Sequence, residues 1–498
     1  MKRGLNQMES VEFDNSYARL SDRFFVRQPP VTVTAPKLIR LNSELAESLG
    51  FNPGSRSPAE WAEVFAGNVL LDGSDPLAMA YAGHQFGSFV PQLGDGRALL
   101  LAEVIDRSGI RCDIQLKGSG PTAFSRNGDG RAAVGAVLRE YVVSEAMHVL
   151  GIPTTRALAA VTTGEPVYRE TKLPGAILTR VARSHVRVGT FQFFAARDNW
   201  QAVRQLADYV VWRNYPDLLD RPKRYAELLQ AVCERQARLV SSWLGVGFIH
   251  GVMNTDNMSI AGETIDYGPC AFMDNYDPAT VFSSIDHSGR YRYDNQLRIA
   301  QWNLARLAET LLPLLDDDQE QAIKQATEII EAFLPHAEEC RLDVMRRKLG
   351  FKESRPGDNE LVESLLTLMH EAQADFTLTF RSLWKAMVPA EPPSELTDQV
   401  GTSGKMVEWF KSWRQRVLSE GVSSQEAAER LRTTNPALIP RNHHVERVLS
   451  AAVTKGDSAP FHHLVEQLAK PFEASADTVP EAAPPRPEQR VTQTFCGT

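Results

Sequence analysis

Two polar segments, residues 250–257 and 266–268, contain the residue types that could hold a divalent ion. The first reads His-Gly-Val-Met-Asn-Thr-Asp-Asn and the second reads Asp-Tyr-Gly, so Asn257 and Asp266 flank a short apolar stretch. Proteins bind Mg²⁺ through one or two carboxylates together with substrate phosphates, so few protein ligands are needed. Both segments also have ordinary turn compositions, and two polar turns around a hairpin are the alternative interpretation.

Three glycine-containing segments could bring backbone N–H groups close to a phosphate. Residues 94–97 read Gly-Asp-Gly-Arg, residues 118–120 read Gly-Ser-Gly, and residues 128–130 read Gly-Asp-Gly. Glycines let the backbone approach an anion, and Arg97 would add positive charge. Each segment alone is also compatible with a hairpin-entry turn or a flexible connection.

These pieces follow one another in the order found in protein kinases. A glycine-rich turn precedes a strand lysine (Lys117) and a helix glutamate (Glu140), and the two polar segments come later. In kinases the corresponding parts hold the nucleotide phosphates and the metal. The order therefore indicates a nucleotide site made by residues far apart in the chain.

The histidine-started loop departs from the kinase pattern at one position. A kinase catalytic loop reads H-R-D-L-x-x-x-N, and placing His250 first puts Asn257 last. The catalytic aspartate is then replaced by Val252, which cannot accept a proton. Either the protein is an inactive kinase, or another group has taken over, and Asp256 is the nearest candidate.

Hydrophobic periodicity predicts the elements that hold these residues. Residues 97–117 are expected to form a β-hairpin, and residues 131–150 a helix that carries Glu140. Helical patterns dominate from residue 198 onward, interrupted at 248–275. The sequence thus predicts an α+β protein, strand-rich with one main helix first and mostly helical afterwards.

One face of the second predicted strand is polar. It carries Arg111, Asp113, Gln115 and Lys117, because alternate residues of a strand share a face. We expect this face to point into a wet cleft.

Composition excludes several classes of protein. The chain has 498 residues, 43% of them hydrophobic, and a formal net charge of −8, which argues against a nucleic-acid-binding protein. No apolar run approaches the roughly 20 residues of a membrane helix, and the first residues lack the apolar region of a signal peptide. Five scattered cysteines do not make a disulfide framework. We expect a cytoplasmic monomer without membrane or nucleic-acid partners.

Six segments in this order resemble one known family. They are YAGHQFG (81–87), QLGDGR (92–97), QLKGSGPT (115–122), SRNGDGR (125–131), HGVMNTDN (250–257) and DYGP (266–269). The resemblance is to the selenoprotein O family, also called the YdiU family, of kinase-like protein adenylyltransferases. It implies a bilobal, protein-kinase-like fold with a strand-rich N-lobe and an enlarged helical C-lobe. The expected parts are an N-terminal extension packing on the core (1–80), a nucleotide-binding N-lobe (81–192), a helical C-lobe (193–470) and a flexible, proline-rich tail (471–498).

The resemblance also implies an activity. Members of that family transfer AMP from ATP to protein hydroxyl groups, and the implied acceptors are Ser, Thr or Tyr side chains of other proteins. UMP transfer from UTP is an implied second activity, and Mg²⁺ or Mn²⁺ the implied metal. ATP is expected to bind flipped relative to kinases, so that its α-phosphate faces the acceptor.

Site residues are implied position by position. Asp256 would accept the proton, Asn257 and Asp266 would hold the metal, and Lys117, paired with Glu140, would neutralise phosphate charge. Cations and a metal suit this reaction, because negative charge develops on the transferring group and on the leaving pyrophosphate. The further implied nucleotide contacts are Gly94, Gly96, Arg97, Asp129, Gly130, Arg180 and Arg187.

The resemblance also suggests a redox role for two cysteines. Cys270 closely follows Asp266, and Cys496 lies near the end of the tail. Family members often carry a redox-active residue near the C-terminus, so a reversible Cys270–Cys496 disulfide is one hypothesis. Two inert thiols are the alternative.

Two other functions stay open. A phosphoryl-transferring protein kinase is one, although Val252 counts against it. A catalytically silent, nucleotide-binding pseudokinase scaffold is the other, although Asn257 and Asp266 count against it because they preserve the metal site.

Overall fold

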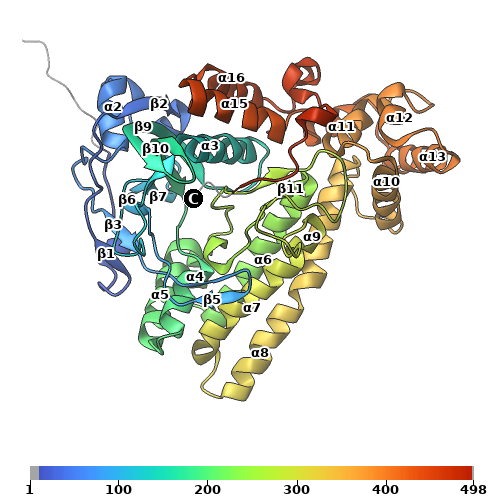
Figure 1. Cartoon of the computed structure of the whole chain (residues 1–498). Helices are drawn as coiled ribbons and strands as arrows, with labels where there is room; N and C mark the ends of the chain where they lie inside the picture. Colours follow the sequence, from blue (N-terminus) through green and yellow to red (C-terminus); the bar gives the residue numbers. More distant parts are fainter. Residues whose placement is uncertain (1–10, 496–498) are drawn as a thin grey trace, which may run out of the picture.

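The computed structural model describes residues 11–495 and has an α+β architecture (Figure 1). A region built on an antiparallel sheet comes first in the chain, and a region built of helices follows it. The predicted fold class is confirmed, and the arrangement is compatible with a bilobal kinase-like fold.

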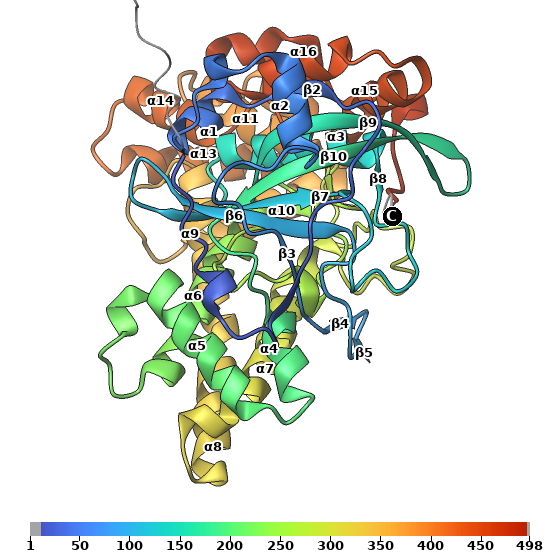
Figure 2. The ribbon, with the colours of Figure 1, turned by 90° about the vertical axis from the view of Figure 1, so that its left-hand side faces the viewer.

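An eight-stranded sheet forms the first region, and Figure 2 shows it facing the viewer. Its strands lie in the order β1-β3-β6-β7-β10-β9-β2, and β8 pairs with β10. The strands are β1 (Phe25–Arg27), β2 (Lys37–Leu41), β3 (Leu77–Met79), β6 (Ala98–Ile105), β7 (Arg111–Lys117), β8 (Ala132–Ala133), β9 (Arg156–Tyr168) and β10 (Lys172–Ala182).

The predicted hairpin is confirmed as β6 and β7, which pair in antiparallel register. Its turn is closed by Asp106, whose Oδ1 accepts hydrogen bonds from the backbone N–H groups of Ser108 (2.9 Å) and Ile110 (2.8 Å). Gly109 has a φ of +82°, a conformation that glycine adopts without strain.

The expectation of a wet polar face on β7 is wrong for Asp113 and Gln115, which are fully buried. Their polar atoms are satisfied by other protein groups instead of water. Asp113 pairs with Arg213 and His185, and Gln115 Nε2 donates to Asp95 Oδ2 at 3.3 Å. Buried polar groups need such partners, so the part of this face that carries Asp113 and Gln115 is shielded from water.

Residues expected to form an N-terminal extension supply part of the sheet. β1 and β2 are its two edge strands, and β3 lies next to β1. The intervening helices are α1 (Ser43–Ser48) and α2 (Pro58–Phe65). Ser57 and Glu60 form a reciprocal capping box at the start of α2, with Pro58 at the first helical position.

The predicted main helix is confirmed as α3 (Val134–Val149). One side of α3 packs on β9 and β10, and the other is covered by α15 (Asn442–Lys455) and α16 (Ala459–Leu468), as Figure 1 shows. Both faces are therefore buried, so its apolar residues surround the helix instead of forming a single stripe.

The second region is a helical body with one small strand pair. α4 to α9 form its centre, and α10 to α14 extend from it (Figure 1). Within residues 11–495, every helix is too short or too polar to span a lipid bilayer. The helices are α4 (Val188–Ala195), α5 (Trp200–Asn214), α6 (Arg224–Gly245), α7 (Gln296–Leu315), α8 (Gln319–Glu331), α9 (Phe333–Lys348), α10 (Asp358–Ala372), α11 (Phe376–Ala386), α12 (Ser394–Val400), α13 (Gly404–Leu418) and α14 (Ser424–Thr434), and β11 (Phe248–Ile249) pairs with β12 (Ala271–Phe272).

The expectation of a flexible tail is wrong for residues 471–495, which pack on the helical body. Arg381 bonds both carboxylate oxygens of Asp477 (2.7 and 3.0 Å), and the fully buried Arg441 donates to the carbonyl oxygen of Ala482 at 3.1 Å. Pro480 and Pro487 each begin a short 3-10 turn, because the φ of proline is fixed near the value such turns need. Two buried arginines thus anchor a segment whose composition suggested disorder.

Candidate functional site

A cavity of about 520 Å³ lies between the sheet and the helical body. Its walls come from the Gly94–Arg97 turn, the end of β7, the loop before α3, β10 and the 250–257 segment. It brings together every implied nucleotide and metal residue except Glu140, which lies behind Lys117. These lining residues are Gly94, Gly96, Arg97, Lys117, Asp129, Gly130, Arg180, Arg187, Asp256, Asn257 and Asp266.

Lys117 joins three elements at the base of the cavity. Its Nζ donates to Glu140 Oε2 on α3 at 2.7 Å and to Asp266 Oδ1 at 3.0 Å. Arg180 on β10 binds the same two carboxylates, with its Nη2 3.1 Å from Asp266 Oδ1. The implied Lys117–Glu140 pair is therefore present, inside a four-membered cluster.

The two cations keep both carboxylates ionised. Burial opposes the charge of Glu140, but Arg180 and Lys117 outweigh it and hold the pKa of Glu140 below its usual value. Burial likewise opposes the charge of Asp266, yet Lys117 and Arg180 lower its pKa well below the usual range. Asp266 also has a φ of +67°, a left-handed conformation that only a tightly determined site retains in a non-glycine residue.

Asn257 and Asp266 form a sparse donor set that fits Mg²⁺ or Mn²⁺. Asn257 Nδ2 donates to the carbonyl oxygen of Val252 at 3.1 Å, which orients the amide and leaves its oxygen for another partner. Within residues 11–495, no cluster of three or more His, Cys, Asp or Glu side chains is arranged to hold a metal. An amide and a carboxylate completed by phosphate oxygens is the pattern Mg²⁺ prefers.

Asp256 is a buried carboxylate at the cavity wall, in a 3-10 turn over Thr255–Asn257. Its Oδ1 accepts no hydrogen bond from the described residues. Burial raises the pKa of Asp256 to about 6, although Arg187 acts in the opposite direction. An under-solvated carboxylate with this pKa suits proton acceptance near neutral pH.

A short hairpin holds the Asp256 turn in place. The hairpin consists of β4 (Gly83–Gln85) and β5 (Ser88–Val90). The backbone N–H of His84 donates to Thr255 Oγ1 at 2.7 Å, and a Cβ added at Gly83 would lie 2.7 Å from Asp256 Oδ1. The glycine is therefore needed so that the hairpin can approach the carboxylate.

Arg187 links the start of α4 to the Asp256 turn. Its Nη1 donates to the carbonyl oxygen of Asp256 at 3.0 Å, and its guanidinium lies over the Tyr81 ring, 4.4 Å from the centroid. Its Nη2 lies 3.8 Å from Asp95 Oδ1. Sequence reasoning missed Asp95, although it lies inside the quoted glycine-rich turn.

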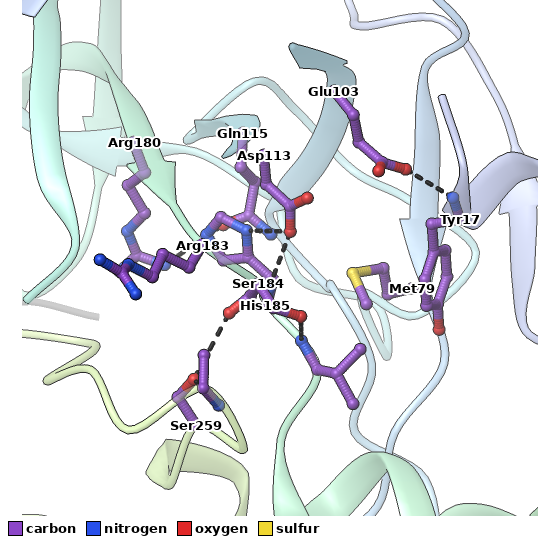
Figure 3. Close-up of polar contacts among 12 residues, drawn as sticks. Tyr17, Met79, Glu103, Asp113, Gln115, Arg180, Arg183, Ser184, His185 and Ser259 are labelled. Carbon is purple, nitrogen blue, oxygen red and sulfur yellow. Dashed lines mark hydrogen bonds and ion pairs between the residues drawn. The ribbon is translucent and has the colours of Figure 1, made fainter. Parts of the chain in front are cut away.

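The joint between β10 and α4 is fixed from both sides, as Figure 3 shows. His185 donates its backbone N–H to Asp113 Oδ2 at 2.8 Å, and its Nδ1 lies 3.0 Å from the same oxygen. Ser259 Oγ donates to the carbonyl oxygen of Ser184 at 3.4 Å. The segment leading to Arg187 is thereby tied to the sheet and to the helical body.

The loop before α3 forms the outer wall. Asp129 accepts from Arg169 Nη1 at 2.7 Å and from the backbone N–H of Arg131 at 3.0 Å. Seven basic and four acidic side chains line the cavity, although the chain as a whole is acidic. The basic residues that sequence reasoning missed are Arg126, Arg131 and Arg169, and this surplus suits a polyanion such as a triphosphate.

Cys270 lies behind the site and is fully buried, and burial raises the pKa of its thiol to about 12. Arg139 Nη2 donates to its carbonyl oxygen at 2.7 Å. Thr494 Oγ1 donates to the carbonyl oxygen of the neighbouring Pro269. Cys496, the other half of the expected disulfide, lies outside the described residues.

Comparison with known proteins identifies the family of this chain. A family model described as "Protein adenylyltransferase SelO" matches residues 7–469. A protein nucleotidyltransferase YdiU of Bradyrhizobium sp. (strain ORS 278) is 58% identical over 489 residues, covering 98% of this chain and 99% of that protein. The proteins of the same name from Rhizobium rhizogenes (57% over 488 residues; 98% and 97%) and Rhizobium meliloti (54% over 491 residues; 99% and 100%) are similarly close.

Proposed function

The chain belongs to the SelO family of protein adenylyltransferases, and from this premise we propose how the cavity performs the transfer. ATP binds with its phosphates against Lys117, Arg180 and Arg187, and its α-phosphate faces Asp256. A hydroxyl group of an acceptor protein attacks the α-phosphorus, the bond to the pyrophosphate breaks, and AMP stays on the acceptor oxygen. The observation that carries this proposal is the convergence of the Lys117–Glu140–Arg180–Asp266 cluster and Asp256 on one cavity.

Asp256 accepts the proton of the attacking hydroxyl. Its pKa of about 6 means that it is mostly ionised at pH 7, yet basic enough to assist proton removal. Val252, at the position of the kinase aspartate, cannot perform this step.

Lys117, Arg180 and Arg187 stabilise the charge that develops on the leaving pyrophosphate. Guanidinium groups bind phosphate oxygens through paired N–H donors, and burial strengthens each contact. Glu140 takes no part in bond changes and instead keeps Lys117 and Arg180 in position. A divalent ion, when bound, would neutralise further phosphate charge, and Asn257 and Asp266 would hold it.

Labelled nucleotides test the reaction. The purified chain is incubated with an acceptor protein and ATP carrying the label on either the α- or the γ-phosphate. Retained α-label is expected, whereas retained γ-label would indicate a kinase and no retained label a silent scaffold. Parallel reactions with α-labelled UTP test UMP transfer, and Mg²⁺ and Mn²⁺ are compared in each. Hydrolysis and mass spectrometry then identify Ser, Thr or Tyr as the acceptor.

The proposal includes a reversible disulfide between Cys270 and Cys496. Thr494 docks beside Pro269, so the chain leading to Cys496 approaches the segment that contains Cys270. When a Cys270–Cys496 disulfide forms, the two thiols lose two protons and two electrons. An oxidant such as peroxide accepts them and is reduced to water. Non-reducing peptide mapping after mild oxidation is expected to find this pair. Its absence would leave two inert thiols.

The proposal also keeps the expected setting, a monomer acting in the cytoplasm on protein substrates without nucleic acid. Size-exclusion chromatography with light scattering checks the oligomeric state. Cell fractionation checks the location.

A further inference from the structure

A second cavity, of about 660 Å³, lies between the sheet region and the helical body and shares no lining residue with the nucleotide cavity. The sheet region contributes α1, the β6–β7 turn, the end of α3 and the end of β10. The helical body contributes α6 and residues 261–263. The cavity therefore bridges the two regions at a place separate from the nucleotide site.

Three arginines on this cavity make at most long ion pairs, of 3.6 Å or more, with carboxylates of the described residues. Arg183 is more than half exposed, and its Nε lies 3.9 Å from Glu263. Arg238 is also mostly exposed and lies 3.6 Å from Glu234 on its own helix. Arg235 donates only to carbonyl oxygens. Each guanidinium retains unused donors.

The two lining carboxylates, in contrast, already have partners. Asp106 accepts three hydrogen bonds within its own turn, from the N–H and hydroxyl of Ser108 and the N–H of Ile110. Glu263 Oε2 accepts the backbone N–H of Arg183 at 2.9 Å. The cavity therefore has three weakly paired guanidinium groups and two lining carboxylates that already accept hydrogen bonds, an arrangement that favours an anion.

Apolar side chains form most of the rest of the wall. A ligand must therefore present a hydrophobic surface as well as a charge, and this volume suits a molecule of metabolite size. The apolar lining residues are Leu45, Leu49, Ile110, Ile152, Pro153, Val181 and Leu239.

We propose that this cavity binds a small organic anion, a carboxylate, sulfonate or phosphate ester attached to an apolar body. The anionic group lies among Arg183, Arg235 and Arg238, and the apolar body lies against α1 and the β6–β7 hairpin. Such a ligand touches both regions of the protein at once.

The floor of the cavity leads directly to the metal motif. Residues 261–263 run into Thr264, whose N–H donates to the carbonyl oxygen of Pro153 at 2.9 Å and whose carbonyl oxygen accepts from Thr155 at 3.0 Å. Asp266 follows two residues later. A ligand in this cavity therefore packs beside the backbone that positions Asp266.

The probe is 1-anilinonaphthalene-8-sulfonate, an apolar anion whose fluorescence rises when it is buried. It is titrated into the full-length protein with Mg²⁺ and α,β-methylene-ATP at saturating concentration, so that the nucleotide cavity is filled. We expect saturable binding at one site. The double variant R183Q/R238Q should weaken it by about tenfold or more, because charge-assisted bonds are lost. The variant Ser242→Trp should also weaken it, because the indole fills the cavity while the arginines remain.

The matched control is R221Q/R347Q, which removes two exposed arginines that do not line the cavity. This control should bind the probe as the parent protein does, and unchanged thermal unfolding of all variants shows that each is folded. The proposal is overturned by the absence of saturable probe binding when the nucleotide analogue is present, or by equal affinity in R183Q/R238Q, Ser242→Trp and the control.

Discussion

Glu140 Oε2 accepts a 2.7 Å hydrogen bond from Lys117 Nζ, while its other oxygen accepts from Arg180. One buried carboxylate on α3 thus positions two cations of the candidate site that come from neighbouring strands. Its loss would leave Asp266 as the one carboxylate partner of both cations among the described residues.

Glu140→Gln should lower the transfer rate at least a hundredfold and destabilise the protein by about 3 kcal/mol, because breaking a buried ion pair leaves uncompensated charge. Urea unfolding and α-label transfer measure the two effects. Glu338→Gln is the matched control, since Glu338 bonds Arg341 at 2.7 Å on the surface. Its effect should stay below about 1 kcal/mol, and an equally mild Glu140→Gln would contradict the assigned role.

Asp256→Asn should retain more activity than Asp266→Asn. A general base contributes about 10²–10⁴-fold, whereas loss of Asp266 removes the proposed metal ligand and a partner of Lys117 and Arg180. Single-turnover rates with α-labelled ATP compare them at several metal concentrations. Equal losses in both variants would count against this division of roles.

Activity should fall at acidic pH as Asp256 takes up a proton. With a pKa of about 6, the rate should be nearly constant above pH 7 and decrease about tenfold per pH unit well below pH 6. A pH–rate profile measured with saturating ATP checks this. The residual activity of Asp256→Asn should not show this fall in rate at acidic pH. If both proteins gave the same pH–rate profile, a group other than Asp256 would cause the fall.

The buried carboxylate of Asp256 should also lower the free energy of unfolding. Because the folded-state pKa of Asp256 is about 6 and its usual value is 3.8, ionisation is disfavoured in the folded protein. The penalty is absent below the usual value, grows as pH rises through this interval, and is complete above pH 6. The free energy of unfolding of Asp256→Asn should therefore exceed that of the parent protein by about 3 kcal/mol at pH 8. This difference should shrink toward pH 4. Urea unfolding without nucleotide or divalent ions measures it.

Gly83→Ala should disturb the Asp256 turn without removing a reactive group. Its Cβ would lie 2.7 Å from Asp256 Oδ1, so the hairpin or the carboxylate must move. We expect kcat to drop about tenfold or more, with little change in ATP affinity. Gly404→Ala is the control, since a Cβ there meets no atom within 4 Å. An unchanged kcat in Gly83→Ala would show that the hairpin does not position the base.

Truncation after Lys470 should destabilise the helical body by about 3 kcal/mol or more, because Arg381 loses Asp477 and the buried Arg441 loses a carbonyl partner. Asp477→Asn isolates the first contribution. A truncated protein that unfolds at the same urea concentration as the full chain would restore the view of residues 471–495 as a loose tail.

The sequence predicted those helices and strands in which buried residues recur at one regular spacing. The β6–β7 hairpin and α3 follow from alternation and from 3.6-residue spacing. The edge strands β1 and β2 do not, because strands of three and five residues are too short for a pattern. The packing of the tail was also hidden, since it depends on two distant buried arginines.

The candidate site was predicted from a different kind of signal, the order of several short motifs along the chain. Glycine-rich turns and the Asn257–Asp266 spacing became informative only in their order along the chain. The buried Asp113–His185 contact was not predictable, because a polar strand face reads as solvated unless its distant partners are known. Asp95 and Arg169 were missed because local sequence does not tell which side chains of a loop turn inward.

α3, which carries Glu140, is covered by α15 and α16 from near the end of the chain. During synthesis the ribosome releases the sheet and α3 long before these two helices exist. The nascent nucleotide region therefore exposes an apolar helix face until translation is almost finished. A chain that ends before α15 would leave this face of the helix that carries Glu140 uncovered.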